Sequence, residues 1–227
     1  MGRRAILGLS SLVVALAVVG SYAPPPPGPI GWETRITPGF DPPIEYVLVY
    51  EMWGPSTVGT LDEQVAGWGE EAAPALIALY EVPEWKDWRG HILTILDRFE
   101  SEAVTAFLRD EAVKHAELPA DKDHRNYLLP QLLRLLGKRD AAAADAIVNG
   151  LLSDPDSPHM NTAISYLLSR AGQPGGKSYR EKLEAIAETT PTPRIAEWIH
   201  KALTQDASQM RANEPMYLVL EREGQGQ

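Results

Sequence analysis

The stretch LLPQLLRLLGKRDAAAADAIVNGLLSDPDSPHMNTAISYLLSR, residues 128–170, decides the fold of this chain. Its apolar residues recur three and four positions apart, which is the spacing of amphipathic helices, and strand-like alternation is almost absent. Turn residues interrupt the pattern at Gly137 and at Asp154-Pro155 and divide it into successive helical segments. The stretch therefore predicts helices that follow one another with short connections.

The pattern repeats with a fixed period after residue 60. Four prolines lie thirty-six residues apart, and each follows an apolar helical segment: Pro83, Pro119, Pro155 and Pro191. Beyond each turn, three further series keep the same period: Ile92, Leu128 and Ile164; Leu96, Leu132 and Leu168; Arg98, Arg134 and Arg170. One pair of antiparallel helices cannot bury its apolar stripe alone, so the pairs must stack. The sequence predicts an all-α fold, a right-handed α-solenoid of about four antiparallel helix pairs over residues 60–205.

Two segments resemble HEAT repeats. One is EAAPALI at residues 71–77 with Trp88-Arg89 in the next helix, and the other is LLSDPD at 151–156 with Met160 and Ala163. HEAT repeats carry a proline in the first helix, an Asp/Pro turn, and a hydrophobic residue followed by arginine in the second helix. The resemblance covers about two-thirds of the chain. It implies a curved, armadillo-like scaffold whose second helices line the concave side, and it implies no single activity.

The repeats depart from the HEAT pattern in two respects. Only the first pair has the proline of the first helix, and the arginine expected in the second helix is present at Arg89 and Arg125 but replaced by Asn161 and Glu197. The fourth pair is therefore the weakest match or a capping repeat.

The N-terminal residues have the features of an export signal. Arg3 and Arg4 precede an apolar and small-residue run, Ala5 to Gly20. Residues 1–23 are interpreted as a signal peptide or an uncleaved signal anchor, which predicts a periplasmic or extracytoplasmic domain. Residues 24–43 hold eight prolines and predict a semi-rigid linker.

The remaining segments are a capping segment and a tail. Asp41-Pro42-Pro43, a helix-start signal, precedes residues 44–59. The residues that follow it are rich in β-branched and aromatic side chains, which favour a strand, and we expect a capping helix there. Residues 206–227 form the expected C-terminal tail.

Composition excludes several classes of function. The chain has 227 residues, no cysteine and a net charge of -10. Thiol nucleophiles, cysteine-ligated metals and iron–sulfur clusters are therefore excluded. The negative charge, without a compensating Lys/Arg-rich run, argues against a nucleic-acid partner.

Two motifs suggest chemistry when taken alone. Residues 171–178, AGQPGGKS, satisfy a relaxed phosphate-loop pattern, in which Lys177 and Ser178 would contact phosphate and magnesium. A phosphate loop must leave a strand, however, and this segment follows the second helix of a predicted repeat. The cluster Asp121-Lys122-Asp123-His124, with His115 upstream, lacks zinc or EF-hand spacing and fits helix-start acids better. The sequence nominates no catalytic, metal or cofactor-binding residue.

The second helices supply the candidate binding residues. Ile92, Leu96 and Phe99 mark the buried side, so the opposite side is expected to offer a concave surface to a protein partner. The candidates are the Tyr, Trp, Arg and His residues of that side: His91, Arg98, Tyr127, Arg134, Tyr166, Arg170 and Trp198. The interpretation is a non-catalytic, protein-binding scaffold of the cell envelope. Two alternatives remain open, a nucleotide-binding protein and a structural, self-associating module.

Overall fold

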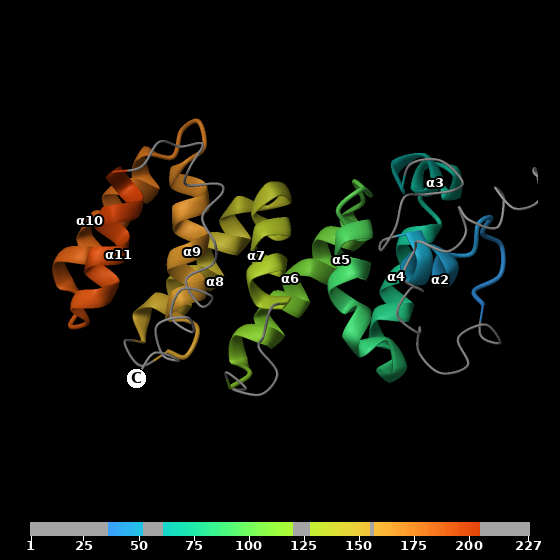
Figure 1. Ribbon diagram of the computed structural model, residues 1–227, viewed down its shortest axis with the longest axis horizontal. Coiled ribbons are helices and arrows are strands. Elements are labelled where there is room, and N and C mark those ends of the chain that lie inside the picture. The colour runs from blue at the N-terminus through green and yellow to red at the C-terminus, as the bar shows by residue number, and fades with distance from the viewer. Residues whose placement is uncertain (1–35, 52–60, 120–127, 155–156, 205–227) are drawn as a thin grey trace, which may run out of the picture. The chain divides into compact units, whose positions relative to one another are not determined.

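The computed structural model describes residues 36–51, 61–119, 128–154 and 157–204 (Figure 1). Within these ranges the regular secondary structure is entirely helical, so the predicted all-α class is confirmed. The segments 1–35 and 205–227 lie outside the described residues, and with them the predicted export signal, most of the linker and the tail. Among the described helices, none is both long and apolar enough to cross a membrane.

The chain divides into two compact units between Gly69 and Glu70. The first unit contains α2 (Ile44–Tyr46), the π-helix η2 (Val47–Glu51) and α3 (Leu61–Trp68). The expected capping segment is thus helical over its described part. The second unit begins at Glu70, after α3, and the sequence placed the start of the repeats at residue 60.

Contacts within the first unit join the residues that precede α2 to α2 and α3. The Trp68 Nε1–H donates to the Pro42 carbonyl at 2.7 Å, and the Trp68 ring meets the Phe40 ring edge-on at 6.3 Å. The carboxylate of Glu45 is fully buried and accepts a hydrogen bond from the Thr37 amide at 2.9 Å.

The second unit is a succession of helices. In chain order they are α4 (Ala72–Glu81), the 3-10 helix η3 (Pro83–Trp88), α5 (Arg89–Leu96), α6 (Glu102–Glu117), α7 (Leu128–Arg139), α8 (Ala141–Ser153), α9 (Met160–Ala171), α10 (Lys177–Thr189) and α11 (Pro193–Thr204).

Four of these helices end two residues before a proline of the periodic series. The residue before a proline is pushed out of the α region by the proline ring. Val82, Leu118, Asp154 and Thr190, which precede the four prolines, accordingly adopt ψ angles of 122°, 142°, 107° and 131°. As a result α4, α6, α8 and α10 end at positions thirty-six residues apart.

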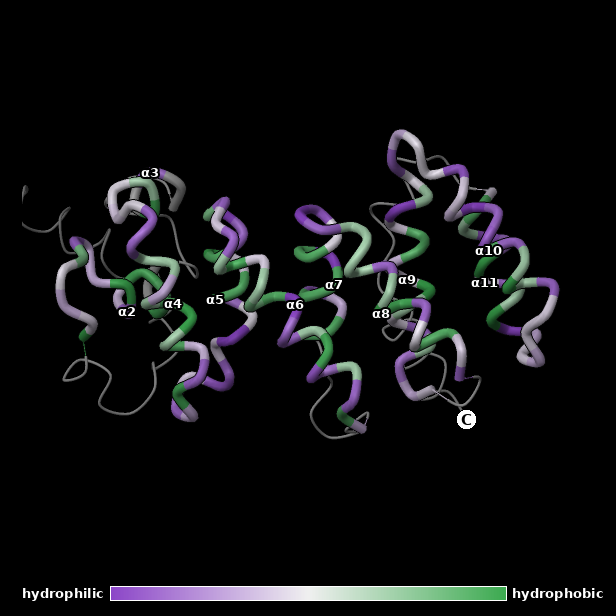
Figure 2. The backbone as a smooth tube through the Cα atoms, turned by 180° about the vertical axis from the view of Figure 1, so that it is seen from behind, coloured by the Kyte–Doolittle hydropathy of each residue, from purple (hydrophilic) through white to green (hydrophobic). Residues whose placement is uncertain are grey.

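Helices two apart in the chain pack against each other in the second unit. We call α4, α6 and α8 the even row, because α6 contacts both α4 and α8, and α5, α7 and α9 the odd row, because α7 contacts both α5 and α9. Consecutive helices from α6 to α11 also contact each other, and so do α4 and α5. Hydrophobic and hydrophilic residues alternate along these helices (Figure 2). The periodic residues Ile92, Leu96, Leu132, Ile164 and Leu168 are buried as predicted, whereas Leu128 is half-buried.

One carboxylate joins three helices at the far end of the rows. Asp145 of α8 accepts the hydroxyl of Tyr166 of α9 at 2.9 Å and the hydroxyl of Tyr179 of α10 at 2.8 Å. The Tyr166 ring lies directly against Gly137 of α7, where a Cβ atom would be 2.8 Å from the ring. The glycine is therefore required by close packing between α7 and α9.

Replacing Gly137 by alanine should destabilise the protein by about 1–3 kcal/mol, because the ring of Tyr166 is buried and its hydroxyl is held by Asp145. Gly150→Ala in α8 is the control, since a Cβ there meets nothing within 4 Å. Alanine should stabilise that helix by up to about 1 kcal/mol. Urea unfolding followed by circular dichroism measures both, and equal effects at the two positions would contradict the packing argument.

Candidate functional site

Three of the predicted binding residues are the arginines of the periodic series, and their surroundings differ. Arg98 is exposed directly after α5, and its Nη1 donates to the Thr94 carbonyl at 2.8 Å. Arg134 is exposed in the middle of α7. Arg170, in the last turn of α9, is half-buried, with Nη1 3.3 Å from the Gly137 carbonyl and the guanidinium 5.3 Å from the Tyr179 ring centre. The three arginines share one position in the thirty-six-residue period, but they differ in exposure and in the groups that they contact.

The other predicted residues have different outcomes. Tyr166 is only 5% exposed and its hydroxyl is taken by Asp145, so the exposure expected for it is wrong. The helical phase of Tyr166 predicts the solvent side. It does not reveal the contact with Gly137, because that contact depends on how α9 packs against α7. His91 and Trp198 are half-buried, and burial lowers the pKa of His91. Tyr127 lies outside the described residues.

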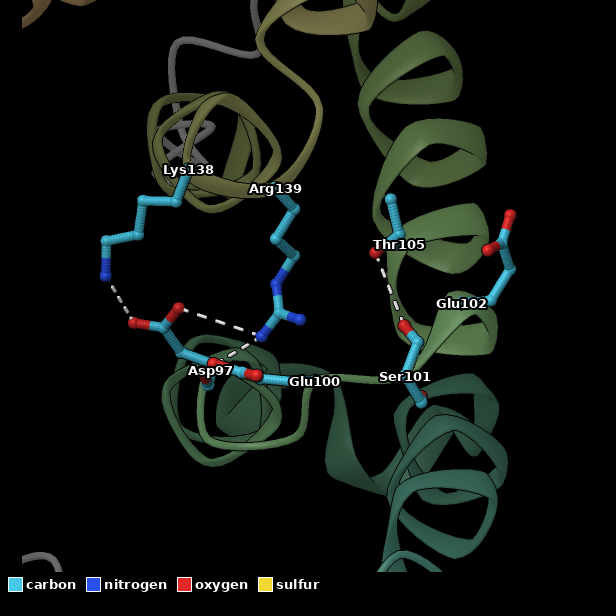
Figure 3. Close-up of a pocket in the computed structure, with 7 residues that line it drawn as sticks. All are labelled: Asp97, Glu100, Ser101, Glu102, Thr105, Lys138 and Arg139. Atoms are coloured by element: carbon cyan, nitrogen blue, oxygen red, sulfur yellow. Dashed lines mark hydrogen bonds and ion pairs between the residues drawn. The ribbon is translucent and has the colours of Figure 1, made fainter.

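A polar pocket lies where α5 and α7 end and α6 begins. Its volume is about 550 Å³, and Figure 3 shows the seven residues that line it: Asp97, Glu100, Ser101, Glu102, Thr105, Lys138 and Arg139. Lys138 and Arg139 both extend from the end of α7 toward Asp97 (Figure 3). The periodic series does not include these two cations, although their position in the last turn of a helix is a recognisable signal.

Arg139 binds the carbonyl groups at the end of α5. Its guanidinium donates to the carbonyls of Phe99 at 2.6 Å, Asp97 at 2.9 Å and Leu96 at 3.2 Å. The last carbonyls of a helix have no partner within the helix, and a cation favours the negative end of its dipole. Arg139 therefore closes α5 and ties it to α7.

The carboxylate of Asp97 completes this arrangement. It accepts a hydrogen bond from Lys138 Nζ at 2.6 Å and lies 3.9 Å from an Arg139 nitrogen. The Ser101 hydroxyl accepts the Val104 amide at 3.2 Å as the N-terminal cap of α6. The Asp97 carboxylate is thus engaged with the cations at the end of α7, and the Ser101 hydroxyl with the start of α6. Across the described part of the chain, no group of three or more His, Asp or Glu side chains is placed to hold a metal ion.

The two rows of helices differ in charge. Within their bounds α5, α7 and α9 carry five Lys or Arg and no Asp or Glu: Arg89, Arg134, Lys138, Arg139 and Arg170. The even row carries six acidic and two basic residues: Glu81, Glu102, Asp110, Glu111, Glu117 and Asp145 against Arg109 and Lys114. The formal charges are therefore +5 for the odd row and -4 for the even row, in a chain whose net charge is -10. The odd row therefore has a charge of opposite sign to that of the whole chain.

The phosphate-loop-like segment is a turn between two helices. It follows α9 and not a strand, and Lys177 is exposed at the start of α10 with its Nζ 3.6 Å from Glu181. Gly175 has a φ of +82°, and a Cβ on Gly176 would lie 2.5 Å from the Arg170 carbonyl oxygen. The glycines are explained by the tight connection between α9 and α10.

A buried polar cluster that was not predicted from the sequence lies between α4 and α6. Glu111 and His115 of α6 are both buried, with Glu111 Oε2 3.6 Å from His115 Nε2, and the Tyr80 hydroxyl of α4 is 3.5 Å from the same nitrogen. Lys114 Nζ also donates to Glu111 Oε1 at 2.9 Å. Burial alone would raise the pKa of Glu111, but the interactions with His115 and Lys114 outweigh it and lower the pKa to about 2. The cluster includes Tyr80 of α4 as well as residues of α6. The residue spacing within α6 does not reveal this contact between two helices.

The Tyr80 side chain of this cluster is fully buried. Burial, reinforced by the nearby charge of Glu111, raises the pKa of Tyr80, so this phenol stays protonated at neutral pH. Its ring lies between the guanidinium of Arg89 at 4.7 Å and the Phe107 ring at 5.1 Å. The cluster serves to join α4 to α6.

Comparisons with known proteins add no relative: a scan of protein-family models, a search of curated proteins and a search of solved structures each found no match to this chain.

Substituting Arg139 by lysine should cost about 1–3 kcal/mol of stability, because an ammonium group cannot serve three carbonyls of α5 as the planar guanidinium does. Lys138→Gln, one residue away, removes a partly exposed ion pair and should cost less than about 1 kcal/mol. Chemical denaturation of the two variants tests the difference. A larger loss for Lys138→Gln would mean that the ion pair, not the helix closure, dominates.

The Glu111 carboxylate should make stability depend on acid pH. Its pKa in the folded state, about 2, is below the ordinary 4.5, so the stabilisation is complete above pH 4.5 and is lost as the pH falls from 4.5 through about 2. Glu111→Gln should reduce the change of the unfolding temperature with pH over this window. Glu117→Gln, at an exposed position of the same helix, should leave that pH dependence unchanged. Thermal unfolding from pH 6 to pH 2 measures the slopes, and an unchanged slope in Glu111→Gln would refute the assignment.

Proposed function

We propose that the protein is a non-catalytic scaffold that binds another protein through the odd row. The observation that carries the proposal is the charge of this row, five cations and no acid, on a chain of net charge -10. A cationic surface on an acidic body selects partners by charge and speeds their encounter. Arg134 is the exposed arginine within this row, and Arg98 is exposed two residues beyond the end of α5. Arginine is frequent at the energetic centres of interfaces.

The stacking that we propose for the second unit is a HEAT-like, right-handed α-solenoid. Two observations support it: α4, α6, α8 and α10 end thirty-six residues apart, and α5–α7–α9 and α4–α6–α8 each pack in succession. In such a stack the odd-row helices form a continuous face, so that one partner contacts several helices at once.

A binding role also fits the state of the polar groups. Three ionised side chains of the pocket, Asp97, Lys138 and Arg139, engage each other or the end of α5, and the buried members of the Tyr80 cluster contact one another. An active site instead needs groups placed to act on a substrate.

The site of action that we propose is the cell envelope. The support is the sequence of residues 1–23, with two arginines ahead of an apolar run, and the proline-rich residues 24–43 that would separate a membrane anchor from the domain. Under this proposal the chain is tethered if the segment is retained and released if it is cleaved.

Arg134→Glu should strongly weaken partner capture while leaving the fold intact, because the side chain is exposed on α7 and reversal of charge repels an acidic partner. The matched control is Lys177→Glu, an 88% exposed cation outside the odd row. Photo-cross-linking in the producing cells, followed by mass spectrometry, identifies the partner and quantifies its capture. Loss of capture in Lys177→Glu, or normal capture in Arg134→Glu, would rule out the odd row as the binding surface.

A further inference from the structure

The buried cluster between α4 and α6 contains a carboxylate oxygen that needs a donor. Tyr80, Glu111 and His115 are 0%, 5% and 7% exposed. His115 Nε2 lies 3.6 Å from Glu111 Oε2 and 3.5 Å from the Tyr80 hydroxyl. Glu111 Oε2 is buried and accepts no hydrogen bond within the described part of the chain. A buried oxygen in this state costs free energy until a donor reaches it.

Protonation of His115 would supply that donor. A neutral imidazole has an N–H on one ring nitrogen and a lone pair on the other, so Nε2 is either a donor or an acceptor. A protonated ring has an N–H on both nitrogens, and Nε2 can then donate toward Glu111 whatever the second nitrogen contacts. The 3.6 Å separation is already that of an ion pair with a charged histidine. The cluster therefore has a place for one more proton.

The carboxylate stays ionised where histidines titrate. The interactions with His115 and Lys114 lower the pKa of Glu111 to about 2 despite its burial, so its negative charge persists throughout the range from about pH 5 to pH 8. A neighbouring anion favours the charged form of an imidazole, whereas burial opposes it. The negative charge required to hold a proton on the ring is therefore present.

The other charged groups near the cluster leave this place open. Lys114 Nζ binds the other oxygen of Glu111, Oε1, at 2.9 Å. Arg89 of α5 is directed at Tyr80, because its Nε donates to the Tyr80 carbonyl at 2.9 Å. Glu81 of α4 adds a negative charge near Lys114 and Tyr80. Helices α7 and α8 also pack against α6, and their charged residues are exposed or bound to other groups: Arg134, Lys138, Arg139 and Asp145.

We propose that the contact between α4 and α6 is a proton-binding joint, in which His115 takes up a proton from solvent on mild acidification, pairs with Glu111 and holds the two helices together more tightly. The joint also reaches α5, because Arg89 is bound to the Tyr80 carbonyl. This inference concerns the even row and does not depend on the proposed function.

Thermal unfolding of the full chain in detergent, at pH 8 and at pH 5.5, tests the effect on stability. A proton that the folded state binds more tightly than the unfolded state stabilises the folded state as the pH falls. The melting temperature of His115→Gln should therefore fall further below that of the unaltered protein at pH 5.5 than at pH 8, by about 2–4 °C. Glu111→Gln should show the same pH-dependent deficit, whereas His200→Gln, at an exposed position of α11, should show none.

Hydrogen exchange of the unaltered protein locates the effect and requires no variant to fold. After correction for the intrinsic pH dependence of exchange, the amides of α4 should exchange at least about three-fold more slowly at pH 5.5 than at pH 8. The amides of α11 should show no such change, because α11 is not part of the joint.

Several results would overturn the proposal. Equal protection of α4 at the two pH values would show that no proton tightens the joint. A deficit of His115→Gln that is the same at both pH values would give the ring a packing role alone. Full pH dependence in Glu111→Gln would mean that this carboxylate does not hold the proton, and loss of the pH dependence in His200→Gln would assign the proton to α11.

Discussion

The effect of a proline ring on the residue before it sets the boundaries on which the second unit depends. Val82, Leu118, Asp154 and Thr190 are all extended, and four helices end one residue before them. These ends recur at a constant interval, so each chain reversal comes thirty-six residues after the one before it. Helices two apart then meet along comparable faces, and the odd and even rows follow from this local rule.

Polar contacts between helices then fix how the rows meet. Arg139 and Gln131 join α7 to α5, Asp145 joins α8 to α9 and α10, and the Tyr80 cluster joins α4 to α6. Each of these groups is wholly or partly removed from water, so leaving one without its partner would cost more than the net gain of a single hydrogen bond. They make the relative position of neighbouring helices specific, where apolar packing alone would tolerate sliding.

The binding surface that we propose arises from the same separation of roles. Within the odd row, Lys138 pairs with Asp97 and Arg139 binds the last carbonyls of α5, whereas Arg134 is exposed. The acidic residues are more numerous on the even row, so the two rows differ in the sign of their charge. Under the proposed function, this difference directs an acidic partner to the odd row.

The helices, their proline-limited ends and the buried series of Ile92, Leu96 and Leu132 could be predicted from the sequence, because chain stiffness before proline and apolar periodicity are local properties. The exposure of Arg98 and Arg134 followed from the same periodicity. The fates of Tyr166, Arg170 and Glu111 could not be predicted in this way. Tyr166 is buried because Gly137 on another helix leaves room for its ring, Arg170 is drawn toward a carbonyl of α7, and the low pKa of Glu111 belongs to a cluster that includes Tyr80 of α4. The sequence alone determined where helices begin and end, and only the tertiary structure decided which polar side chains they bury, because burial depends on neighbours distant along the chain.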